Sequence, residues 1–436
     1  MKISVIGCGY LGAVHAACMA ELGHDVIGVD VDQSKIDALA AGKAPFFEPG
    51  LPELLISAGA TGRLRFTTDM SQIADAEIHF VAVGTPQKKG EFAADLTYVD
   101  AAVDALIPYL SDGDLVVGKS TVPVGTAARL AEKVAAGSAK ASLAWNPEFL
   151  REGFAVKDTL TPDRLVYGVE SGEAGERATA QLDEIYATAL SHDTPRIVTD
   201  FATAELVKVS ANAFLATKIS FINAMAEIAE ATGADVTQLA DAIGHDVRIG
   251  RRFLNSGLGF GGGCLPKDIR AFRARGEELG LGDSLAFLGE VDAINLRRRD
   301  RMVDLAREEL GGDLTGKRIA VLGLAFKPDS DDVRDSPALD VAARLHAEGA
   351  IVLANDPEAN GTAARVRPEL TFVDTAAEAI VDADAVLVLT EWKQYRELVP
   401  ADLAAASGRI ILDGRNCLDR NLWRDAGWHY RSLGRP

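Results

Sequence analysis

The first thirty residues restrict the fold more than any other part of the chain. Lys2 to Ile6 is a short apolar run, and Gly7-Cys8-Gly9-Tyr10-Leu11-Gly12 follows it. An alanine-rich stretch and a second apolar run come next, and this run ends at Asp30. The order strand, glycine turn, helix and strand predicts a parallel βαβ unit. Its glycines let the backbone approach a pyrophosphate at a helix N-terminus, so we predict a dinucleotide site.

Asp30 indicates which dinucleotide this site binds. A carboxylate after the second strand accepts hydrogen bonds from ribose hydroxyls and repels a 2′-phosphate, so Asp30 favours NAD over NADP. Lys35 lies close enough in sequence to reach the adenosine side. A solvated lysine on a helix surface is an equally good interpretation of Lys35.

Polar residues follow further apolar runs of the same region. Ile78 to Val83 leads to Thr85, and Leu115 to Gly118 leads to Ser120 and Thr121. Parallel strands deliver their carboxyl ends to one edge of a sheet, so these hydroxyls are expected to line the cofactor crevice. The alternative is that they only cap turns or helices.

Two carboxylates, Glu148 and Glu152, follow the strand-like run Ser142 to Ala144. If the segment between them is helical, both can face one cleft as acid and base groups. They could equally be solvated. The runs Leu165 to Val169 and Arg196 to Val198 are expected to be the last strands of this domain.

Helical spacing replaces the strand pattern from Phe201 to Ala231 and again from Asp283 to Leu310. A helix as long as the first would bridge two domains. Glu205, Lys208 and Asn212 lie on one face of it, which indicates a polar pocket or a salt-bridged surface. The basic cluster Arg297 to Arg299 is expected to be a solvated face of the second helix.

A glycine-rich loop leads into a predicted helix between these two segments. Gly257 to Gly263 holds five glycines in seven residues, and Cys264, Lys267 and Asp268 follow. A helix N-terminus and a nearby lysine favour a thiolate, so Cys264 is a candidate nucleophile. The alternative is a buried cysteine that packs as a small apolar residue.

The last third of the chain repeats the opening pattern without its glycine turn. Apolar runs at Lys317 to Leu322 and Ile351 to Ala354 predict a second βαβ unit. A domain without the pyrophosphate glycines is expected to bind something other than a second dinucleotide. Lys327 and Arg415 are basic groups at predicted strand ends, which suits a phosphorylated substrate.

The predicted fold class is therefore α/β, with two Rossmann-like, doubly wound parallel-sheet domains joined by a long central helix and a further helical region. The predicted domains are residues 1–199, which bind NAD, 200–312, which carry the cysteine loop, and 313–436, which bind the substrate.

Composition narrows the class of protein. A formal net charge of −19 argues against a nucleic-acid or membrane-surface binder. The four cysteines form no C-x-x-C pair, so we expect no disulfide framework, no metal site and a reducing, cytoplasmic location. We also expect no signal peptide and no membrane span.

Several motifs occur in one order along nearly the whole chain: the glycine turn after the first strand, Gly84-Thr85-Pro86, and the segments 120–126, 146–153, 205–219, 248–268 and 323–337. In this the chain resembles the UDP-glucose/GDP-mannose dehydrogenase family. The resemblance implies an NAD-dependent, four-electron oxidation of a sugar alcohol to a carboxylate through a thioester on Cys264. It favours UDP-glucose as substrate, with GDP-mannose as the alternative. It also implies a homodimer or higher homo-oligomer formed through the central helices, in which Arg248 acts in the neighbouring site.

The resemblance also assigns roles to individual residues. The catalytic set is Cys264, Lys208, Asp268, Glu148, Asn212 and Thr121. The NAD set is Gly7, Gly9, Tyr10, Leu11, Gly12, Asp30, Lys35, Thr85, Thr121, Glu152, Lys267 and Arg334. The substrate set is Glu148, Phe149, Leu150, Lys208, Asn212, Arg248, Phe253, Asn255, Gly257, Phe260, Gly261, Cys264, Lys327 and Arg415. Gly263 departs from the family pattern, which often has serine there.

Two other classes of function stay open at this stage. A two-electron hydroxyacid dehydrogenase would need no cysteine, and a silent nucleotide-binding regulator would bind both ligands without turnover.

Overall fold

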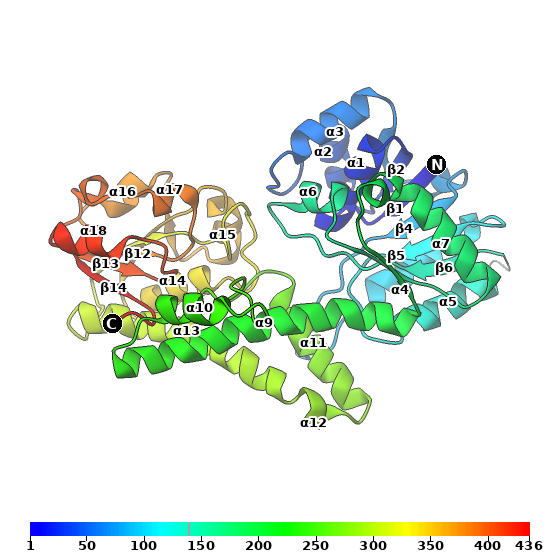
Figure 1. Cartoon of the computed structure of the whole chain (residues 1–436). Coiled ribbons are helices and arrows are strands. Elements are labelled where there is room, and N and C mark those ends of the chain that lie inside the picture. The colour runs from blue at the N-terminus through cyan, green and yellow to red at the C-terminus, as the bar shows by residue number, and fades with distance from the viewer. Residues whose placement is uncertain (138–139) are drawn as a thin grey trace. The chain divides into compact units, whose positions relative to one another are not determined.

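The computed structural model describes residues 1–137 and 140–436. The chain forms two compact units, of which the first comprises Met1–Ala211 and Ala274–Gly280, and the second Asn212–Arg273 and Leu281–Pro436. Helices α9 (Phe201–Thr232) and α11 (Leu265–Glu278) contribute residues to both units (Figure 1). Each unit has its own sheet, and the predicted boundaries near residues 200 and 313 stay predictions.

The first unit contains an eight-stranded sheet. Its strands, in spatial order, are β3 (Leu64–Thr67), β2 (Asp25–Val29), β1 (Lys2–Ile6), β4 (Ile78–Val81), β5 (Leu115–Gly118), β6 (Ser142–Trp145), β7 (Leu165–Gly168) and β8 (Arg196–Thr199). The first six follow the dinucleotide-binding order, whose switch point lies between β1 and β4. This confirms the predicted fold class and places the glycine turn at that switch point.

One strand pair of this sheet departs from the predicted parallel arrangement. Strands β6 and β7 pair antiparallel, with Trp145 opposite Gly168. Only one short helix, α6 (Ala155–Leu160), lies between them. The connection returns the chain at the same edge of the sheet, whereas a parallel partner would need a crossover to the opposite edge.

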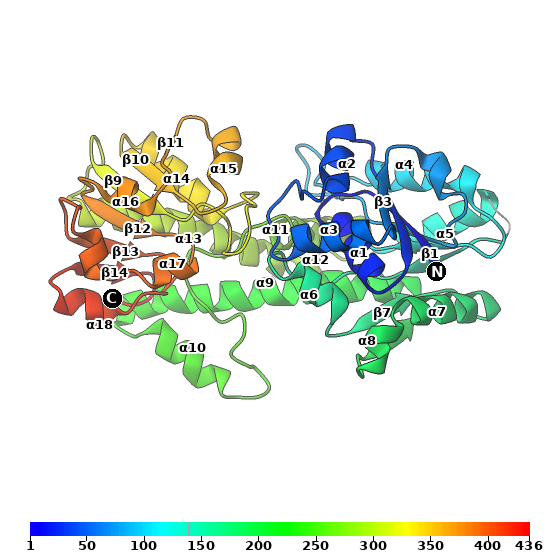
Figure 2. The ribbon, with the colours of Figure 1, turned by 90° about the horizontal axis from the view of Figure 1, so that it is seen from above.

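Helices cover both faces of the first sheet (Figures 1 and 2). One face packs Ile3, Val5 and Phe80 into one core, and the other packs Ile6 and Val81 into a second. The central strands β1, β4 and β5 are buried on both sides, which is why they occur in the sequence as largely apolar runs. The edge strand β8 is mostly exposed. The helices of this unit, besides α6, are α1 (Tyr10–Glu21), α2 (Gln33–Ala40), α3 (Leu51–Ala60), α4 (Thr97–Leu106), α5 (Thr126–Gly137), α7 (Glu173–Ile185) and α8 (Ala187–Ser191), with short 3₁₀ helices at Met70–Ile73 and Ile107–Tyr109.

The second unit repeats this strand order in a six-stranded parallel sheet. Its strands, in spatial order, are β11 (Thr371–Phe372), β10 (Ile351–Asn355), β9 (Arg318–Leu322), β12 (Ala385–Val388), β13 (Ile410–Asp413) and β14 (His429–Ser432). Its flanking helices are α14 (Pro337–Ala347), α15 (Asn360–Val366), α16 (Ala376–Ile380), α17 (Lys393–Arg396) and α18 (Arg420–Asp425), with a 3₁₀ helix at Pro400–Leu403. The predicted second Rossmann-like domain is therefore confirmed.

The helical part of the second unit contains the other end of α9 together with α10 (Val236–Gly244), α12 (Gly282–Leu285) and α13 (Phe287–Glu309). The predicted single helix from Asp283 is thus two helices, which meet at Ala286. The expectation of a solvated basic cluster is also wrong, since Arg298 is fully buried and its guanidinium lies 3.1 Å from Glu230 of α9. Its neighbour Arg299 is buried as well. Packing of α13 against acidic partners draws both arginines inward.

Within residues 1–137 and 140–436, no helix combines the length and the apolar character that a membrane crossing requires.

Candidate active site

The glycine turn of the first unit has the shape that a pyrophosphate needs. Gly7 has a φ of +92°, which favours glycine, and a Cβ at Gly12 would overlap the Gly7 carbonyl oxygen. A Cβ at Gly9, in contrast, would meet no atom within 4 Å. The N-terminus of α1 is therefore open beside Gly9, and the turn fits the phosphates of a dinucleotide.

Asp30 lies at the end of β2, next to this turn. Its Oδ2 accepts hydrogen bonds from the Cys8 amide and from Lys35 Nζ, both at 2.8 Å. Lys35 thus contacts the predicted ribose-binding carboxylate. The pair fixes the orientation of the carboxylate beside the turn.

The hydroxyls predicted at the next strand ends connect the loops after β4 and β5. Thr85 Oγ1 donates to the Thr121 carbonyl at 2.7 Å, and Ser120 Oγ donates to the Val83 carbonyl at 2.6 Å. Neither hydroxyl caps a helix. They hold the two loops together at the switch-point edge of the sheet.

Glu48 ties the start of α1 to the loop before α6, a role that the sequence did not reveal. This buried carboxylate accepts from the Gly153 amide at 2.6 Å and the Ala155 amide at 2.7 Å, and it also contacts the Tyr10 hydroxyl. Burial, followed by the hydrogen bond to Glu48, raises the pKa of Tyr10 far above its usual value. The predicted cofactor residue Tyr10 is therefore a hydroxyl donor to Glu48.

Glu148 pairs with Lys208 of α9. The Lys208 Nζ atom lies 2.8 Å from Glu148 Oε1, and Glu148 Oε2 accepts from the Leu150 amide at 2.8 Å. Residues 146–150 are not helical, so a shared helix does not align Glu148 with Glu152. Instead, the extended segment after β6 carries Glu148 to the lysine, and the Phe149 ring lies 5.5 Å from the same Nζ.

Glu205 serves a different purpose from its neighbours on α9. Its two carboxylate oxygens accept from the Gly125 amide at 2.8 Å and the Ala127 amide at 2.7 Å, at the start of α5. Burial raises the pKa of Glu205, and these amides oppose the shift. Glu205 thus caps helix α5. On the predicted polar face of α9, Glu205 is a structural residue, whereas Lys208 pairs with Glu148.

In the second unit, Cys264 directly precedes α11 and is exposed. Its carbonyl accepts from the Asp268 amide at 2.9 Å. The Asp268 carboxylate is buried and is held by Asn212 Nδ2 at 2.7 Å and Lys267 Nζ at 2.5 Å. The thiol lies at an exposed helix start, and the fixed carboxylate of Asp268 lies one turn further along the helix. This arrangement is suitable for a nucleophile.

The glycine-rich loop is held by two buried asparagines that the sequence did not reveal. Asn223 Oδ1 accepts from the Gly257 amide at 2.9 Å, while the Asn295 side chain exchanges two hydrogen bonds with the Phe260 backbone at 2.7 and 2.9 Å. A Cβ at Gly259 would overlap the Asn295 side chain.

Arg415 connects three segments around the same loop. Its guanidinium donates to the carbonyls of Gly259 at 2.9 Å, Leu389 at 2.8 Å and Phe326 at 3.2 Å. Lys327 Nζ lies 5.4 Å from the Phe326 ring centroid. Both predicted phosphate-binding cations are therefore at the carboxyl ends of β9, β12 and β13, as expected for a ligand site of this fold.

Asp356 shows why the second unit differs from the first as a nucleotide site. It follows β10 as Asp30 follows β2, yet its Oδ2 accepts from the amides of Leu324 at 2.7 Å and Ala325 at 3.0 Å and from Trp392 Nε1 at 3.1 Å. This carboxylate is 2% exposed. The Asp356 carboxylate already accepts hydrogen bonds from its own turn, so it is not available to ribose hydroxyls.

Three further predicted substrate residues, Arg248, Phe253 and Asn255, are exposed, and Phe253 also has a strained backbone conformation. Arg248 has an 85% exposed side chain and pairs with Asp246 at 2.5 Å. Phe253 has a φ of +65°, an uncommon conformation for a bulky residue and one that collects at binding sites. Asn255 accepts a hydrogen bond from Arg251 at 2.8 Å.

Arg334, predicted to contact NAD, is held by Asp332 at 2.6 Å. A Cβ at Gly263 would overlap its guanidinium. The absence of a side chain at Gly263 therefore leaves room for Arg334 in this position.

Comparison with known proteins identifies the same three parts. Residues 1–190, 202–297 and 320–420 match the NAD binding domain, the central domain and the UDP binding domain of the UDP-glucose/GDP-mannose dehydrogenase family. The chain is 41% identical to a UDP-glucose 6-dehydrogenase from Rhizobium meliloti, with all of both chains covered. It is 41% identical to a UDP-glucose 6-dehydrogenase from Bacillus subtilis, covering all of this chain and 93% of that one.

A solved structure is also similar over the full length. It is a UDP-glucose dehydrogenase from Pyrobaculum islandicum, with a TM-score of 0.89 and 40% identity over 99% of this chain and 96% of that chain.

Proposed function

Because this chain belongs to the UDP-glucose/GDP-mannose dehydrogenase family, we propose that it oxidises UDP-glucose to UDP-glucuronate, with NAD as hydride acceptor and Cys264 as nucleophile. The proposed role of Cys264 rests on its position in the second unit. Its side chain is exposed and directly precedes α11, whose first turn contains the Asp268 carboxylate held by Asn212. A packing cysteine would be buried, as Cys8 and Cys18 are.

The proposed chemistry is two oxidations joined by a covalent step. NAD, when bound at the glycine turn, would supply the hydride acceptor for each oxidation. The first removes a hydride and a proton from the primary alcohol and gives an aldehyde. The Cys264 sulfur adds to the aldehyde carbon, and loss of a second hydride and proton gives a thioester. Water then breaks the carbon–sulfur bond and releases the acid and the thiol.

The polar residues have roles that follow from their charges. Lys208 would stabilise the oxyanions, as a fixed ammonium does when charge develops on oxygen. Glu148, its partner at 2.8 Å, would hold or activate water. Asp268 and Asn212 would orient the groups around Cys264, and Thr121 is proposed to complete the catalytic set.

The proposed cofactor site uses the glycine turn and the residues at its edge. Gly7, Gly9 and Gly12 would cradle the pyrophosphate, and Asp30 with Lys35 would bind the adenosine ribose. The remaining proposed contacts are Tyr10, Leu11, Thr85, Thr121, Glu152, Lys267 and Arg334.

The proposed substrate site uses the second sheet. Lys327 and Arg415 are suited to the diphosphate, and the match of residues 320–420 to a UDP binding domain supports UDP over GDP as the nucleotide. The loop from Gly257 to Gly261, with Phe253, Asn255, Phe149 and Leu150, would contact the nucleotide and the sugar. GDP-mannose stays the alternative substrate.

We also propose a homodimer formed through α9. Phe214, Phe221 and Ile228 follow one another at intervals of seven residues on this helix and are 67%, 49% and 58% exposed. A spacing of seven puts them on one stripe of the helix, and an exposed apolar stripe that includes aromatic residues is typical of an interface between chains. The expected cytoplasmic location stays a prediction.

The stoichiometry of the reaction tests the function and the role of Cys264 together. Purified wild-type protein should form two NADH per UDP-glucose, because four electrons leave the alcohol and each NAD takes two. Cys264→Ala should bind both ligands but lose most UDP-glucuronate formation, so the loss should fall on kcat. Cys18→Ala, a buried cysteine outside the proposed site, is the control. Near wild-type carboxylate output from Cys264→Ala would contradict the covalent mechanism, and one NADH per substrate would indicate a two-electron dehydrogenase.

A further inference from the structure

A buried lysine lies behind Glu148 and has no role in the chemistry described above. Lys119 follows β5 directly and is 7% exposed. Its ammonium donates to Asn146 Oδ1 at 3.0 Å and to the Tyr186 hydroxyl at 3.2 Å. Tyr186 in turn donates to Asn146 Oδ1 at 2.7 Å. These three side chains form a closed triangle that joins the ends of β5 and β6 to the junction of α7 and α8.

Burial of the Lys119 ammonium lowers the stability of the folded protein. Its hydrogen-bond acceptors among the described residues are neutral oxygens, and a buried charge without a close counter-ion loses hydration that an apolar side chain would not need. Burial lowers the pKa of Lys119 to about 8, while Glu148 opposes this shift and Lys208 adds to it. A methionine would fill the same volume without this cost, so packing alone does not account for a lysine.

The triangle is connected to the proposed catalytic pair through one short segment. Asn146 also donates to the Val166 carbonyl at 2.9 Å, so its side chain is fixed from both sides. Glu148 is two residues further along, after Pro147, whose ring restricts the backbone. Any shift of Asn146 would therefore move Glu148 relative to Lys208.

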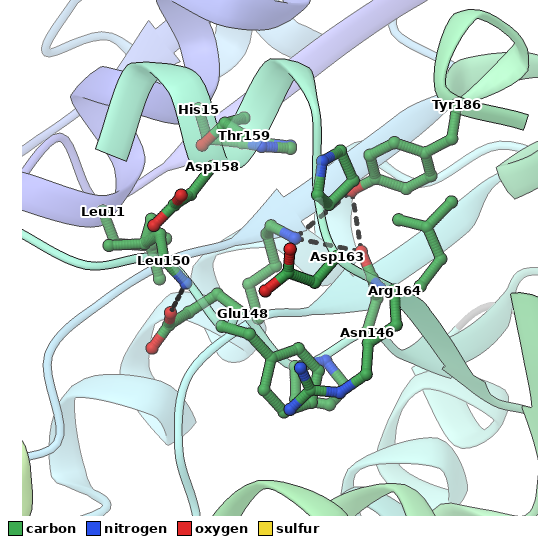
Figure 3. A pocket seen from close by; sticks show the side chains of 15 residues that line it. Leu11, His15, Asn146, Glu148, Leu150, Asp158, Thr159, Asp163, Arg164 and Tyr186 are labelled. Atoms are coloured by element: carbon green, nitrogen blue, oxygen red, sulfur yellow. Dashed lines mark hydrogen bonds between the residues drawn. The ribbon is translucent and has the colours of Figure 1, made fainter. Parts of the chain in front are cut away.

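Lys119 and Glu148 also line one cavity of about 50 Å³, together with His15, Asp158, Asp163 and Tyr186. Figure 3 shows Asn146 and Tyr186 pointing toward one another on one side of this cavity and Glu148 on another. The volume exceeds the roughly 10–15 Å³ that one water molecule requires, so the cavity can hold water next to the buried amine.

We propose that Lys119 is a positioning residue for Glu148: its ammonium, anchored by Asn146 and Tyr186, holds the segment Asn146 to Glu148 so that the carboxylate stays against Lys208. The proposal rests on the proposed function, in which Glu148 and Lys208 act on the substrate. The sequence offers one signal for this role, a lysine between an apolar strand and Ser120.

The pH dependence of turnover follows from this role. The charged and titratable groups that line the cavity with Lys119 and Tyr186 are Glu148, His15 of α1, and Asp158, Asp163 and Arg164 in and after α6. Lys208 of α9 lies outside this lining but also acts electrostatically on Lys119. Burial holds the pKa of His15 well below its usual value, so His15 stays neutral in the relevant range. Lys119 is charged below its pKa, so kcat should fall as the pH rises through about 8.

The experiment compares Lys119→Met with wild type and with Lys140→Met, a control at an exposed lysine. For Lys119→Met we expect kcat to fall about 10- to 100-fold, as for a small misplacement of a reacting group, with the KM values for NAD and UDP-glucose nearly unchanged. The alkaline fall of kcat near pH 8 should disappear. The thermal midpoint should not decrease, because a buried charge has been replaced by an apolar group.

The outcomes separate the possible results. Wild-type kcat in Lys119→Met, or an unchanged alkaline fall, would overturn the proposal, and so would a lower thermal midpoint together with weaker NAD binding. If Lys119→Met does not fold, Tyr186→Phe decides, because loss of one acceptor should move the alkaline fall of kcat to lower pH, and an unmoved fall would overturn the proposal. If the wild type forms no NADH from UDP-glucose, the proposed function fails and this inference with it.

Discussion

At the scale of single residues, the proposed cofactor preference depends on one carboxylate. Asp30 is fixed by the Cys8 amide and by Lys35, both at 2.8 Å, so it faces the glycine turn without needing to reorganise. Asp356 has the same place in the second unit but is consumed by its own turn. The same residue type after the same kind of strand therefore has two different uses.

Substitution of Asp30 tests this preference. Asp30→Ala should raise the KM for NAD and should relax the rejection of NADP, because the ribose hydroxyls lose their acceptor and the 2′-phosphate is no longer repelled. The measurement is kcat/KM with each cofactor. Asp37→Ala, which removes an exposed carboxylate on α2, is the matched control. An unchanged ratio of the two efficiencies in Asp30→Ala would remove Asp30 from the proposed site.

At the scale of elements, Glu205 couples helix α9 to the start of α5. A buried carboxylate that accepts two amides satisfies donors that the first turn of a helix cannot pair internally. The N-terminal end of the helix dipole adds to this stabilisation. Helix α5 begins five residues after Thr121, so its start also restrains the loop that carries this proposed catalytic residue.

Removal of this cap should destabilise the first unit. Glu205→Ala leaves the Gly125 and Ala127 amides without their acceptor, which should cost about 1–3 kcal/mol of unfolding free energy. The measurements are urea unfolding and amide hydrogen exchange of α5. Glu173→Ala, at an exposed position in the first turn of α7, should change stability by less than about 0.5 kcal/mol. Equal effects of the two substitutions would show that Glu205 contributes no more than a surface charge.

At the scale of the whole molecule, the proposed dimer gives Arg248 a place to act. Its side chain is largely exposed, with Asp246 as its partner in the same chain. The exposed stripe Phe214, Phe221 and Ile228 supplies the proposed interface. In a two-fold dimer, each chain would present the same arginine to its neighbour.

Mixing two inactive variants tests this arrangement. Arg248→Ala chains combined with Cys264→Ala chains should recover activity, because a mixed dimer would hold one site with both residues intact. Random exchange should restore about a quarter of wild-type activity. Exchange is verified with differently tagged wild-type chains. Mixtures that exchange but stay inactive would place Arg248 in the site of its own chain.

The sequence alone determined the features that depend on neighbouring residues. The glycine turn, the βαβ order of both units, the long helix α9 and the position of Cys264 before α11 were all predicted, and the structure has each of them. These features depend on residues that are close in sequence: glycines that free the backbone, apolar residues at helical spacing, and the residues that begin a helix. A single sequence is therefore sufficient to predict them.

Only the tertiary structure decided the features that depend on distant partners. The triangle around Lys119 joins residues that are 27, 40 and 67 positions apart, and the burial of Arg298 depends on Glu230, 68 positions earlier. The antiparallel pairing of β6 with β7 depends likewise on where the chain re-enters the sheet. From sequence alone, a charged side chain is predicted to be solvated. Its burial and its partners become known only from the tertiary structure, because both depend on residues that are distant in sequence.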